Sequence, residues 1–316
     1  MKLDEIRKIL PGLEKAATPQ QRMQMLAQLR AKGDLPSFSY QELEMSSPLA
    51  DTHRDVSFSN AKVQLHSHNF YEILCCANTC GAEYLLGAER YRLQKGDILF
   101  VCPGVSHRPI LPEGMAQPYV RDVLWLSTEF MQMMSHVEPE WQEPEQEKTN
   151  LLRTSGTRWE FLPEWISAGV QEYEAQAPGW QTMVVGNAMQ VLTHLRRAFQ
   201  DQSAPLTKAE RPQLLEQVLA YVEEHLSEKI RLPEVAQHFY VSTSTISHEF
   251  SRKMGVSFYR CVTQRRLIAA KERIAKGELL ETIGEQVGFS DYSAFYRAFK
   301  AEYGISPRQY RKMQMP

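Results

Sequence analysis

The sequence predicts an α+β chain of several domains, with a β-barrel or sandwich in its N-terminal half and an all-helical C-terminal part. A length of 316 residues exceeds what one hydrophobic core usually serves. Between about Phe38 and Trp125, short apolar or alternating runs are separated by Gly, Asn and Pro, as in all-β folds. Beyond Pro212 the apolar residues follow a helical period, and one pattern occurs twice.

Changes in composition set the expected domain limits. Residues 1–36 are predicted to form a helical extension, and residues 37–126 the strands. The period returns to helical from Glu160 to Phe199, and we expect residues 127–200 to form a helical segment that covers the barrel or mediates self-association. Residues 201–212 mix Ser, Pro and charge, as interdomain linkers do, and residues 213–316 form the helical domain.

Charge restricts the function classes only mildly. From Pro212 onwards there are 15 Lys and Arg against 12 Asp and Glu, a net charge of +3, so the rest of the chain carries −5 and the whole −2. This asymmetry permits a nucleic-acid partner without requiring one. No apolar run approaches the length of a membrane span, and the charged opening stretch lacks the apolar centre of a secretory signal. We therefore expect a cytoplasmic protein with no membrane partner.

The cysteines fit the same compartment. The five of them form no CxxC pair, and we interpret them as reduced packing residues. A thiol sensor built from Cys75, Cys76 and Cys80 is the alternative interpretation.

The strongest signal is an internal repeat with a spacing of 49 residues. Its first copy comprises Ile246, Phe250, Gly255 and Ser257, and its second Phe295, Phe299, Gly304 and Ser306. In each copy two apolar residues share one helical face, and the Gly follows where a helix ends in a left-handed cap. Shorter amphipathic helices, Leu232–Phe239 and Thr282–Val287, precede the copies across tight turns, and Asp291 after the second turn is the predicted N-cap of the helix that follows. Two such helix-turn-helix units, joined by a predicted helix over Ser257–Lys276, favour a DNA-binding domain over an ordinary helical hairpin.

The repeat also resembles a known family. The segments Ile283–Asp291, Phe295–Lys300 and Gly304–Pro307 are similar to the signature of AraC/XylS-type transcription regulators. The upstream copy resembles the family's first unit at Leu232, Val235, Ala236, Val241, Ser242, Ile246, Phe250, Gly255 and Phe258. Gly284 departs from the Ala that the family usually has inside this helix, and should loosen it by under ~1 kcal/mol. The resemblance implies sequence-specific binding of double-stranded operator or promoter DNA.

The helical wheel indicates which side chains face DNA. Because the apolar repeat positions face the core, the outward residues near the start of each second helix are Ser244, Thr245, Ser247 and His248, and then Tyr292, Ser293, Tyr296 and Arg297. Arg297 is the strongest candidate, because a guanidinium can contact guanine O6 and N7 together. Phosphate contacts are expected from Arg252, Arg265, Arg266, Lys253 and Lys300.

A second signal lies in the N-terminal half. The run His66-Ser67-His68-Asn69-Phe70-Tyr71-Glu72 and the later Gly96–His107 segment resemble the two cupin motifs of AraC-type sensor domains. On a strand, His66, His68 and Glu72 have the same parity and can face one barrel interior, where His107 would join them. This resemblance implies a cupin-like β-barrel whose cluster binds a divalent metal such as Fe, Mn, Ni or Zn, lines an organic effector pocket, or serves as a vestigial hydrogen-bonding cluster.

Together these signals predict a ligand-responsive, DNA-binding transcription regulator that is not an enzyme. A sugar or related small molecule is the family-level candidate effector, and RNA polymerase is a further candidate partner. The helical segment 160–199 is predicted to form a homodimer through apolar positions that include Trp165, Trp180, Met183, Val184, Leu192 and Phe199. The alternatives are a metal-dependent cupin enzyme with an accessory DNA-binding domain, and a structural DNA-organising protein.

Overall fold

The computed structural model describes residues 45, 47–57, 65–139, 151–201 and 209–314. The predicted helical extension 1–36 and most of the linker 201–212 lie outside these residues. Two compact units are distinguished, and the division falls inside the long helix that joins the two helical repeats. One unit is Met45–Ala269, and the other contains Ala270–Pro316; each is described by itself below.

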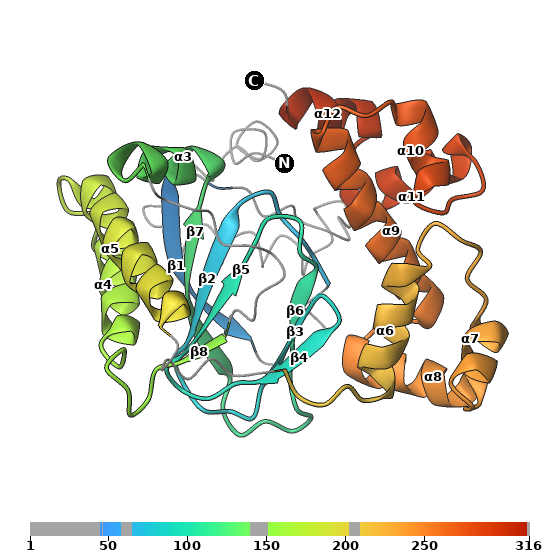
Figure 1. Cartoon of the computed structure of the whole chain (residues 1–316), viewed down its shortest axis with the longest axis horizontal. Helices are drawn as coiled ribbons and strands as arrows, with labels where there is room; N and C mark the ends of the chain where they lie inside the picture. The colour runs from blue at the N-terminus through green and yellow to red at the C-terminus, as the bar shows by residue number, and fades with distance from the viewer. Residues whose placement is uncertain (1–44, 46, 58–64, 140–150, 202–208, 315–316) are drawn as a thin grey trace, which may run out of the picture. The chain divides into compact units, whose positions relative to one another are not determined.

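The N-terminal half forms two antiparallel sheets (Figure 1). The strands are β1 (Ala50–Ser57), β2 (Tyr71–Cys76), β3 (Glu83–Leu86), β4 (Glu89–Arg92), β5 (Asp97–Val101), β6 (His107–Ile110), β7 (Tyr119–Leu126) and β8 (Leu151–Arg153). One sheet has the order β1-β7-β2-β5-β8 and the other the order β4-β3-β6. Among the described residues the two sheets stay separate, as in a sandwich, and an isolated bridge between His66 and His107 extends the smaller one.

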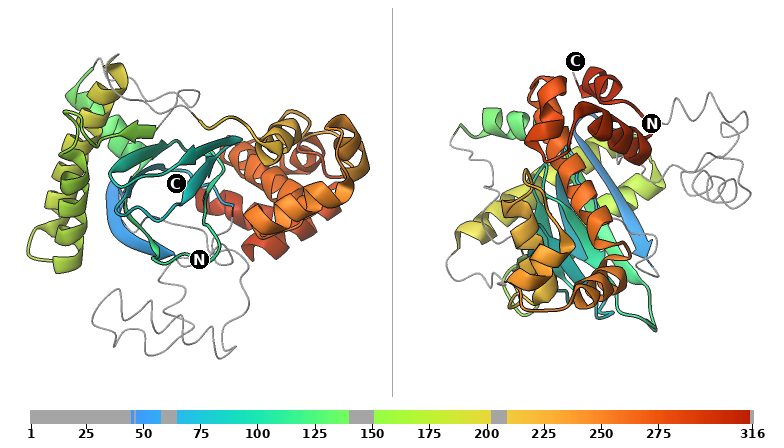
Figure 2. Two further views of the ribbon diagram at one scale, coloured as in Figure 1. Left: turned by 90° about the horizontal axis from the view of Figure 1, so that it is seen from below. Right: turned by 90° about the vertical axis from the view of Figure 1, so that its right-hand side faces the viewer.

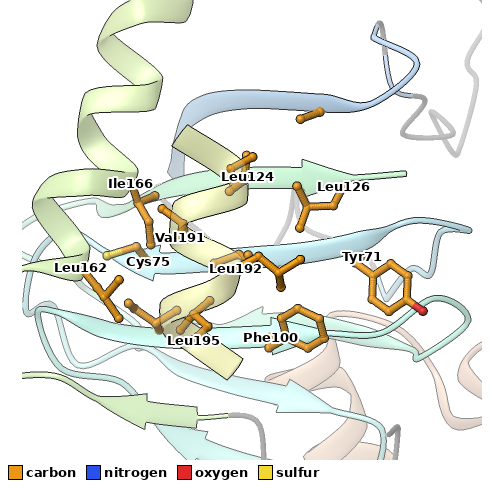
Figure 3. Packing of buried hydrophobic residues seen from close by; sticks show 14 of the residues in the cluster. Tyr71, Cys75, Phe100, Leu124, Leu126, Leu162, Ile166, Val191, Leu192 and Leu195 are labelled. Atoms are coloured by element: carbon orange, nitrogen blue, oxygen red, sulfur yellow. The ribbon is translucent and has the colours of Figure 1, made fainter. Parts of the chain in front are cut away.

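The outer face of the five-stranded sheet carries the main hydrophobic core. Alternate residues of its strands, such as Ile73, Phe100 and Leu124, point to this face and are buried. They are covered by α4 (Leu162–Ala175) and α5 (Trp180–Gln200), and Figure 3 shows side chains of both helices packed on the strands. Two further views show the same helical hairpin against the sheet (Figure 2). A third helix, α3 (Thr128–Val137), contributes to the same core.

The strand β8 was not expected from the sequence. The segment 127–200 was predicted to be helical, yet Leu151–Arg153 pairs with β5 at the edge of the large sheet. Arg153 forms an ion pair with the buried Asp97 at 3.0 Å, and Leu151 and Leu152 are buried. Three residues are too few to show an alternating pattern, because they span barely one period of a strand.

The prediction of partner-facing residues on α5 was also partly wrong, because some of these residues face the sheet. From the sequence, Val184, Leu192 and Met183 were all predicted to lie in the homodimer interface. In the structure Val184 and Leu192 are each 1 % exposed and belong to the core, whereas Met183 is 56 % exposed. Adjacent positions on a helix point 100° apart, so only one of Met183 and Val184 can face the sheet.

The C-terminal part is entirely helical in its described residues. Its elements are α6 (Leu214–Glu224), α7 (Leu232–His238), α8 (Thr243–Glu249), the π-helical turn η3 (Phe250–Met254), α9 (Phe258–Ala275), α10 (Leu280–Gln286), α11 (Tyr292–Tyr303) and α12 (Pro307–Gln314). The repeat holds in three dimensions: Gly255 after η3 has φ 66° and Gly304 after α11 has φ 75°. Both are the left-handed caps that the repeat predicts. The joining helix α9 agrees with the predicted Ser257–Lys276 within one residue at each end.

Gly284 has a packing role that helix propensity alone does not reveal. It lies in α10, and a methyl group at its Cα would come within 2.9 Å of the Cβ of Phe295 in α11. Since Phe295 is completely buried, it has little room to move. The two helices therefore approach each other more closely than an Ala at this position would allow.

We expect Gly284→Ala to lower the free energy of unfolding of the second helix-turn-helix by about 1 kcal/mol. Overpacking costs about 1–3 kcal/mol, which exceeds the gain in helix propensity of about 1 kcal/mol. Urea unfolding followed by circular dichroism measures the difference. Gly186→Ala in α5 is the matched control, because its methyl group would meet nothing within 4 Å and should be neutral or stabilising. Equal stabilisation by both substitutions would contradict the packing argument.

Candidate DNA-binding surface and buried sensor cluster

The first helix-turn-helix unit is α7 followed by α8. The Ser242 hydroxyl accepts a hydrogen bond from the backbone N–H of Thr245 at 3.1 Å, so Ser242 is the N-cap of α8. The same hydroxyl also lies 2.7 Å from the Ser244 hydroxyl and 2.8 Å from that of Thr245. Ile246 and Phe250 turn inward and are buried. The cap and the buried pair fix which face of α8 is presented to solvent.

The second unit, α10 followed by α11, is built in the same way. Asp291 is the N-cap, and its carboxylate accepts from the backbone N–H of Ala294 at 2.7 Å, as the sequence predicts. That hydrogen bond lowers the pKa of the Asp291 carboxyl. Phe295 and Phe299 are fully buried, so the face of α11 that carries them packs inside the domain and the opposite face is presented to solvent.

The predicted base-contacting side chains lie at or near the surface of these helices. Those of Ser244, Thr245, His248, Ser293 and Arg297 are exposed, and those of Ser247, Tyr292 and Tyr296 are half-buried. In the described part of the chain the Arg297 guanidinium has no hydrogen bond or ion pair, so its five N–H groups are free.

The basic residues assigned to phosphate differ in their surroundings. Lys300 is exposed, and Arg252 is exposed but paired with Glu249 at 2.8 Å. Arg266 is half-buried and donates to the carbonyl oxygens of Leu226 at 3.1 Å and Glu228 at 2.6 Å. Arg265 is 2 % exposed, so the prediction of a phosphate contact there is wrong for this conformation. Its guanidinium is turned into the interior instead.

The sensor half contains a buried cluster made of His68, Glu72 and His107. One ligand atom from each lies within 4.8 Å of the others, and all three side chains are at most 5 % exposed. The Glu72 Oε2 is 3.4 Å from His68 Nε2 and 3.0 Å from His107 Nε2. Glu72 Oε1 accepts from the indole N–H of Trp125 at 2.8 Å. Three of the four predicted sensor residues therefore meet in one place.

His66 is placed differently. Its backbone N–H donates to the His107 carbonyl at 3.2 Å, and its carbonyl accepts from the His107 N–H at 2.9 Å. The two imidazole rings lie 4.3 Å apart between centroids, but His66 contributes no ligand atom to the three-residue cluster. Its position is that of a strand neighbour of His107.

Backbone contacts fix the tautomers of the two cluster histidines. The Nδ1 of His68 lies 2.8 Å from the Phe70 carbonyl, and that of His107 lies 2.8 Å from the Val105 carbonyl. Because a carbonyl can only accept, both Nδ1 atoms carry protons. The Nε2 atom of each ring then faces Glu72, and it presents a lone pair when the ring is neutral and an N–H when the ring is protonated. Although His107 Nε2 is close to the carboxylate, it is buried without a well-formed hydrogen bond.

Electrostatics in the cluster favour a neutral ring at His68 and an ionised carboxyl group. Burial lowers the pKa of His68. Burial acts on Glu72 in the opposite sense, but the adjacent imidazoles of His107 and His68 hold the pKa of its carboxyl well below its usual range. The result is one carboxylate oxygen and two imidazole nitrogens around a small shared space.

This donor set fits a divalent metal ion. Histidine ligands of metals commonly donate the second ring N–H to a carbonyl, as both do here. Two imidazole nitrogens and one carboxylate oxygen suit Fe, Mn, Ni or Zn. The buried His107 Nε2 without a hydrogen bond is the atom that such an ion would engage.

The sequence motifs did not identify Trp125 as a residue of the buried cluster. It belongs to the alternating set Tyr119, Arg121, Val123 and Trp125 of β7, which faces away from the α4–α5 core. A buried indole N–H needs an acceptor, and Glu72 supplies it. The alternation of β7 was the available signal, since it places Trp125 on the same face as its strand partner Glu72.

The buried cysteines behave as packing residues, whereas Cys80 of the alternative thiol sensor is partly exposed. Cys75, Cys76 and Cys261 are buried, and burial raises the pKa of the Cys76 thiol to about 12. Burial also raises the pKa of Cys75. Since a thiolate is the reactive form, these thiols are poor candidates for a redox sensor.

The comparisons with known proteins match both halves of the chain. Residues 52–136 match the AraC-like ligand binding domain, and residues 235–313 match a helix-turn-helix domain. The transcriptional activator RhaS of Salmonella arizonae is 26 % identical over 78 % of this chain and 87 % of its own length. The regulator YfiF of Bacillus subtilis is 27 % identical over 79 % of each chain. The chain belongs to the AraC family of transcriptional regulators.

This AraC-family regulator combines a ligand-binding N-terminal domain with a DNA-binding C-terminal domain, so its partners include DNA and a small-molecule effector. A solved structure of ToxT from Vibrio cholerae is 14 % identical and covers 85 % of this chain and 99 % of its own, with a TM-score of 0.35. In the part of the chain that the structure describes, no helix has both the length and the apolar character of a membrane span.

Proposed function

We propose that this regulator reads operator DNA with the exposed first turns of α8 and α11, under the control of an effector bound in the sensor. The observation that carries the proposal is Arg297, which is exposed on the capped helix α11 and forms no hydrogen bond or ion pair with any residue that the structure describes. Ser244, Thr245, Ser247 and His248 form the corresponding surface of α8, with Arg252 beside it. Their short side chains suit water-mediated contacts. In the second unit, Tyr292, Ser293 and Tyr296 flank Arg297, and Lys300 serves a phosphate.

We expect Arg297→Ala to weaken binding of the full chain to a DNA site selected from a random pool by about 1–3 kcal/mol. Binding to random DNA should change much less, because a base contact is lost and not a phosphate contact. Fluorescence anisotropy at several salt concentrations gives both affinities. Lys300→Ala is the comparison variant, and should weaken both DNAs alike while reducing the salt slope. Equal losses on both DNAs for Arg297→Ala would make it a phosphate contact, and no DNA binding at all would overturn the proposal.

The buried cluster of His68, Glu72 and His107 is proposed as the sensing site. The tautomers and the unsatisfied His107 Nε2 support occupancy by a divalent ion. A bound ion would supply positive charge that attracts an anionic or hydroxylated effector. Without an ion, the same lone pairs and carboxylate would accept hydrogen bonds directly from a hydroxylated effector such as a sugar.

We expect the chelator-treated full chain to bind one equivalent of Fe, Mn, Ni or Zn near neutral pH. Elemental analysis after gel filtration gives the stoichiometry, and calorimetry gives the affinity. Glu72→Gln and His107→Ala should each weaken binding at least tenfold, because each removes a ligand or its charge. His194→Ala, a histidine of α5 outside the cluster, is the control. Failure of the wild type to bind any of the four metals would exclude the metal form of the site and leave the organic effector, sought by mass spectrometry of co-purifying molecules.

We further propose that the sensor half forms a homodimer through the outer side of α4 and α5. Support comes from Met183, which is exposed, and from Trp165, Tyr173, Trp180 and Met189, which are only partly covered by the core. Leu192 and Leu195 are unsuitable for testing this interface, because both are buried against the sheet (Figure 3). A charge at either would disrupt the fold of the sensor itself.

Met183→Glu should therefore yield a folded protein that dissociates to monomers at tens of micromolar. Sedimentation velocity reports the association state, and circular dichroism the fold. Gln181→Glu, at an exposed polar position of the same helix, introduces the same charge and should leave the dimer intact. A wild-type protein that sediments as a monomer would refute the dimer and leave the DNA-binding proposal standing.

The remaining assignments follow from the regulator function. RhaS is a transcriptional activator, and activation would make RNA polymerase a further partner of this chain. We place the protein in the cytoplasm, where its DNA target lies. Because the relatives reported above are regulators, we propose a sensing and non-enzymatic role for the cupin-like domain, in preference to a metal-dependent enzyme.

A further inference from the structure

The small sheet β4-β3-β6 has two faces with different partners. Strand pairing places Leu86 opposite His107 and Tyr84 opposite Pro109, which puts these residues on the face toward the buried cluster. The Tyr84 ring is stacked with that of His107, with 6.2 Å between centroids. The alternate residues must face the other way.

That other face is covered by the first helix-turn-helix unit together with its neighbours α6, η3 and α9, which we call the first DNA-binding unit. Leu65, Leu85 and Ile110 of the sensor share one hydrophobic cluster with Leu215, Val218, Leu219, Val222, Ile246, Phe250 and Phe258. All of these residues belong to the compact unit Met45–Ala269, and Figure 1 shows α6 beside the small sheet. The sensor and the first DNA-binding unit therefore share a continuous core.

Three buried arginines bridge the two sides of this core. Arg90 of β4 pairs with Glu216 of α6 at 3.1 Å and with Glu83 at 2.6 Å. Arg108 of β6 donates to the backbone carbonyl of Met254, at the end of η3. A lone guanidinium inside a protein is costly, so such contacts persist only where the partners are held in place.

Arg265 makes the corresponding contact from the helical side. From α9 it donates to the Gly87 carbonyl at 3.0 Å and to the Ser106 hydroxyl at 3.2 Å. It also forms an ion pair with Glu223 of α6. Burial lowers the pKa of Arg265 to about 10, so the group remains charged near neutral pH. Its Nε stays without a hydrogen-bond partner among the described residues.

The sequence Ser106-His107-Arg108 joins these contacts to the sensing cluster. His107 points to Glu72 on one face, and its two neighbours contact α9 and η3 on the other. The chain is rigid here, because Gly87 N–H donates to the Ser106 carbonyl at 2.7 Å and β6 pairs with β3. A displacement of His107 must therefore move Ser106 and Arg108.

The helix α8, which we propose contacts DNA in the first unit, keeps its outer face outside the contact with the sensor. Ser244, Thr245 and His248 remain exposed while α6, η3 and α9 contact the sensor. The interface thus fixes the orientation of the first helix-turn-helix unit and leaves its DNA-facing surface open.

We propose that Ser106–Arg108 and Arg265 form a mechanical link through which occupancy of the His68–Glu72–His107 cluster sets the orientation of the first DNA-binding unit. The link deepens the proposed function, since it assumes that the cluster is the sensing site. Arg265 is a positioning residue, and it acts through Ser106 and Gly87 without touching DNA or effector.

Amide hydrogen exchange of the full chain, without DNA, tests the link. Glu72→Gln serves as the perturbation, because it removes the charge that His107 faces. We expect this substitution to change deuterium uptake in β6 and also in α6 and residues 258–269. In an Arg265→Gln background the change in α6 and 258–269 should fall at least threefold, while the change in β6 should persist.

Arg266→Gln is the matched control, since the neighbouring Arg266 donates to carbonyl oxygens of its own helical domain. It should leave the transmitted change intact. Equal transmission in the Arg265→Gln and wild-type backgrounds, or no change in α6 in any background, would overturn the proposal. Because the measurement contains no DNA, a failure of the link is distinguishable from a failure of the DNA-binding proposal, which the affinity of Arg297→Ala addresses.

Discussion

The central strands of the sensor half must bury side chains on two faces, and this requirement accounts for most of what surrounds the sheets. Strands such as Tyr71–Cys76 and Asp97–Val101 are buried at every position. The large sheet is covered by α4 and α5 on one face and by the interior of the sensor on the other. Among the described residues no helix of the sensor lies on the outer face of the small sheet, and the first DNA-binding unit covers that face.

The same requirement explains the chemistry of the interior. Residues on the inner face of the large sheet include Glu72, Arg121 and Trp125, which are polar or carry a polar atom. Each needs a partner. Trp125 donates to Glu72, which also faces His107, and Arg121 pairs with Asp55 of β1 at 2.7 Å. Because the buried Leu74, Leu99 and Val123 share this face, the interior is mainly apolar with a few polar groups, a combination suited to holding a small ligand away from water.

The sequence predicted the repeat far better than the interfaces. The 49-residue spacing, the Asp291 cap and the Gly304 cap depend on local geometry, which a few neighbouring residues determine. His68 and Glu72 do meet as predicted, but not through strand parity, because His68 precedes β2 and a bend at residues 69–70 separates the two. Arg265 was assigned to phosphate because a basic residue on a helix is usually exposed. Its burial depends on Ser106, 159 residues away, which no local pattern contains. The choice between Met183 and Val184, and the three residues of β8, depend on tertiary neighbours in the same way.

The small sheet is covered by the sensor interior on one face and by the first DNA-binding unit on the other, and this arrangement limits how such a regulator can evolve. A sensor that ended in a solvated surface could be joined to any DNA-binding domain through a linker. Here a foreign domain would leave Leu85 and Ile110 in water and the guanidinium of Arg108 without its carbonyl partner at Met254. Recombination at the linker would therefore succeed only between relatives that keep matching surfaces on α6 and α9. The contact therefore favours inheritance of the two halves as a pair, with new effector specificity arising by substitution within the sensor.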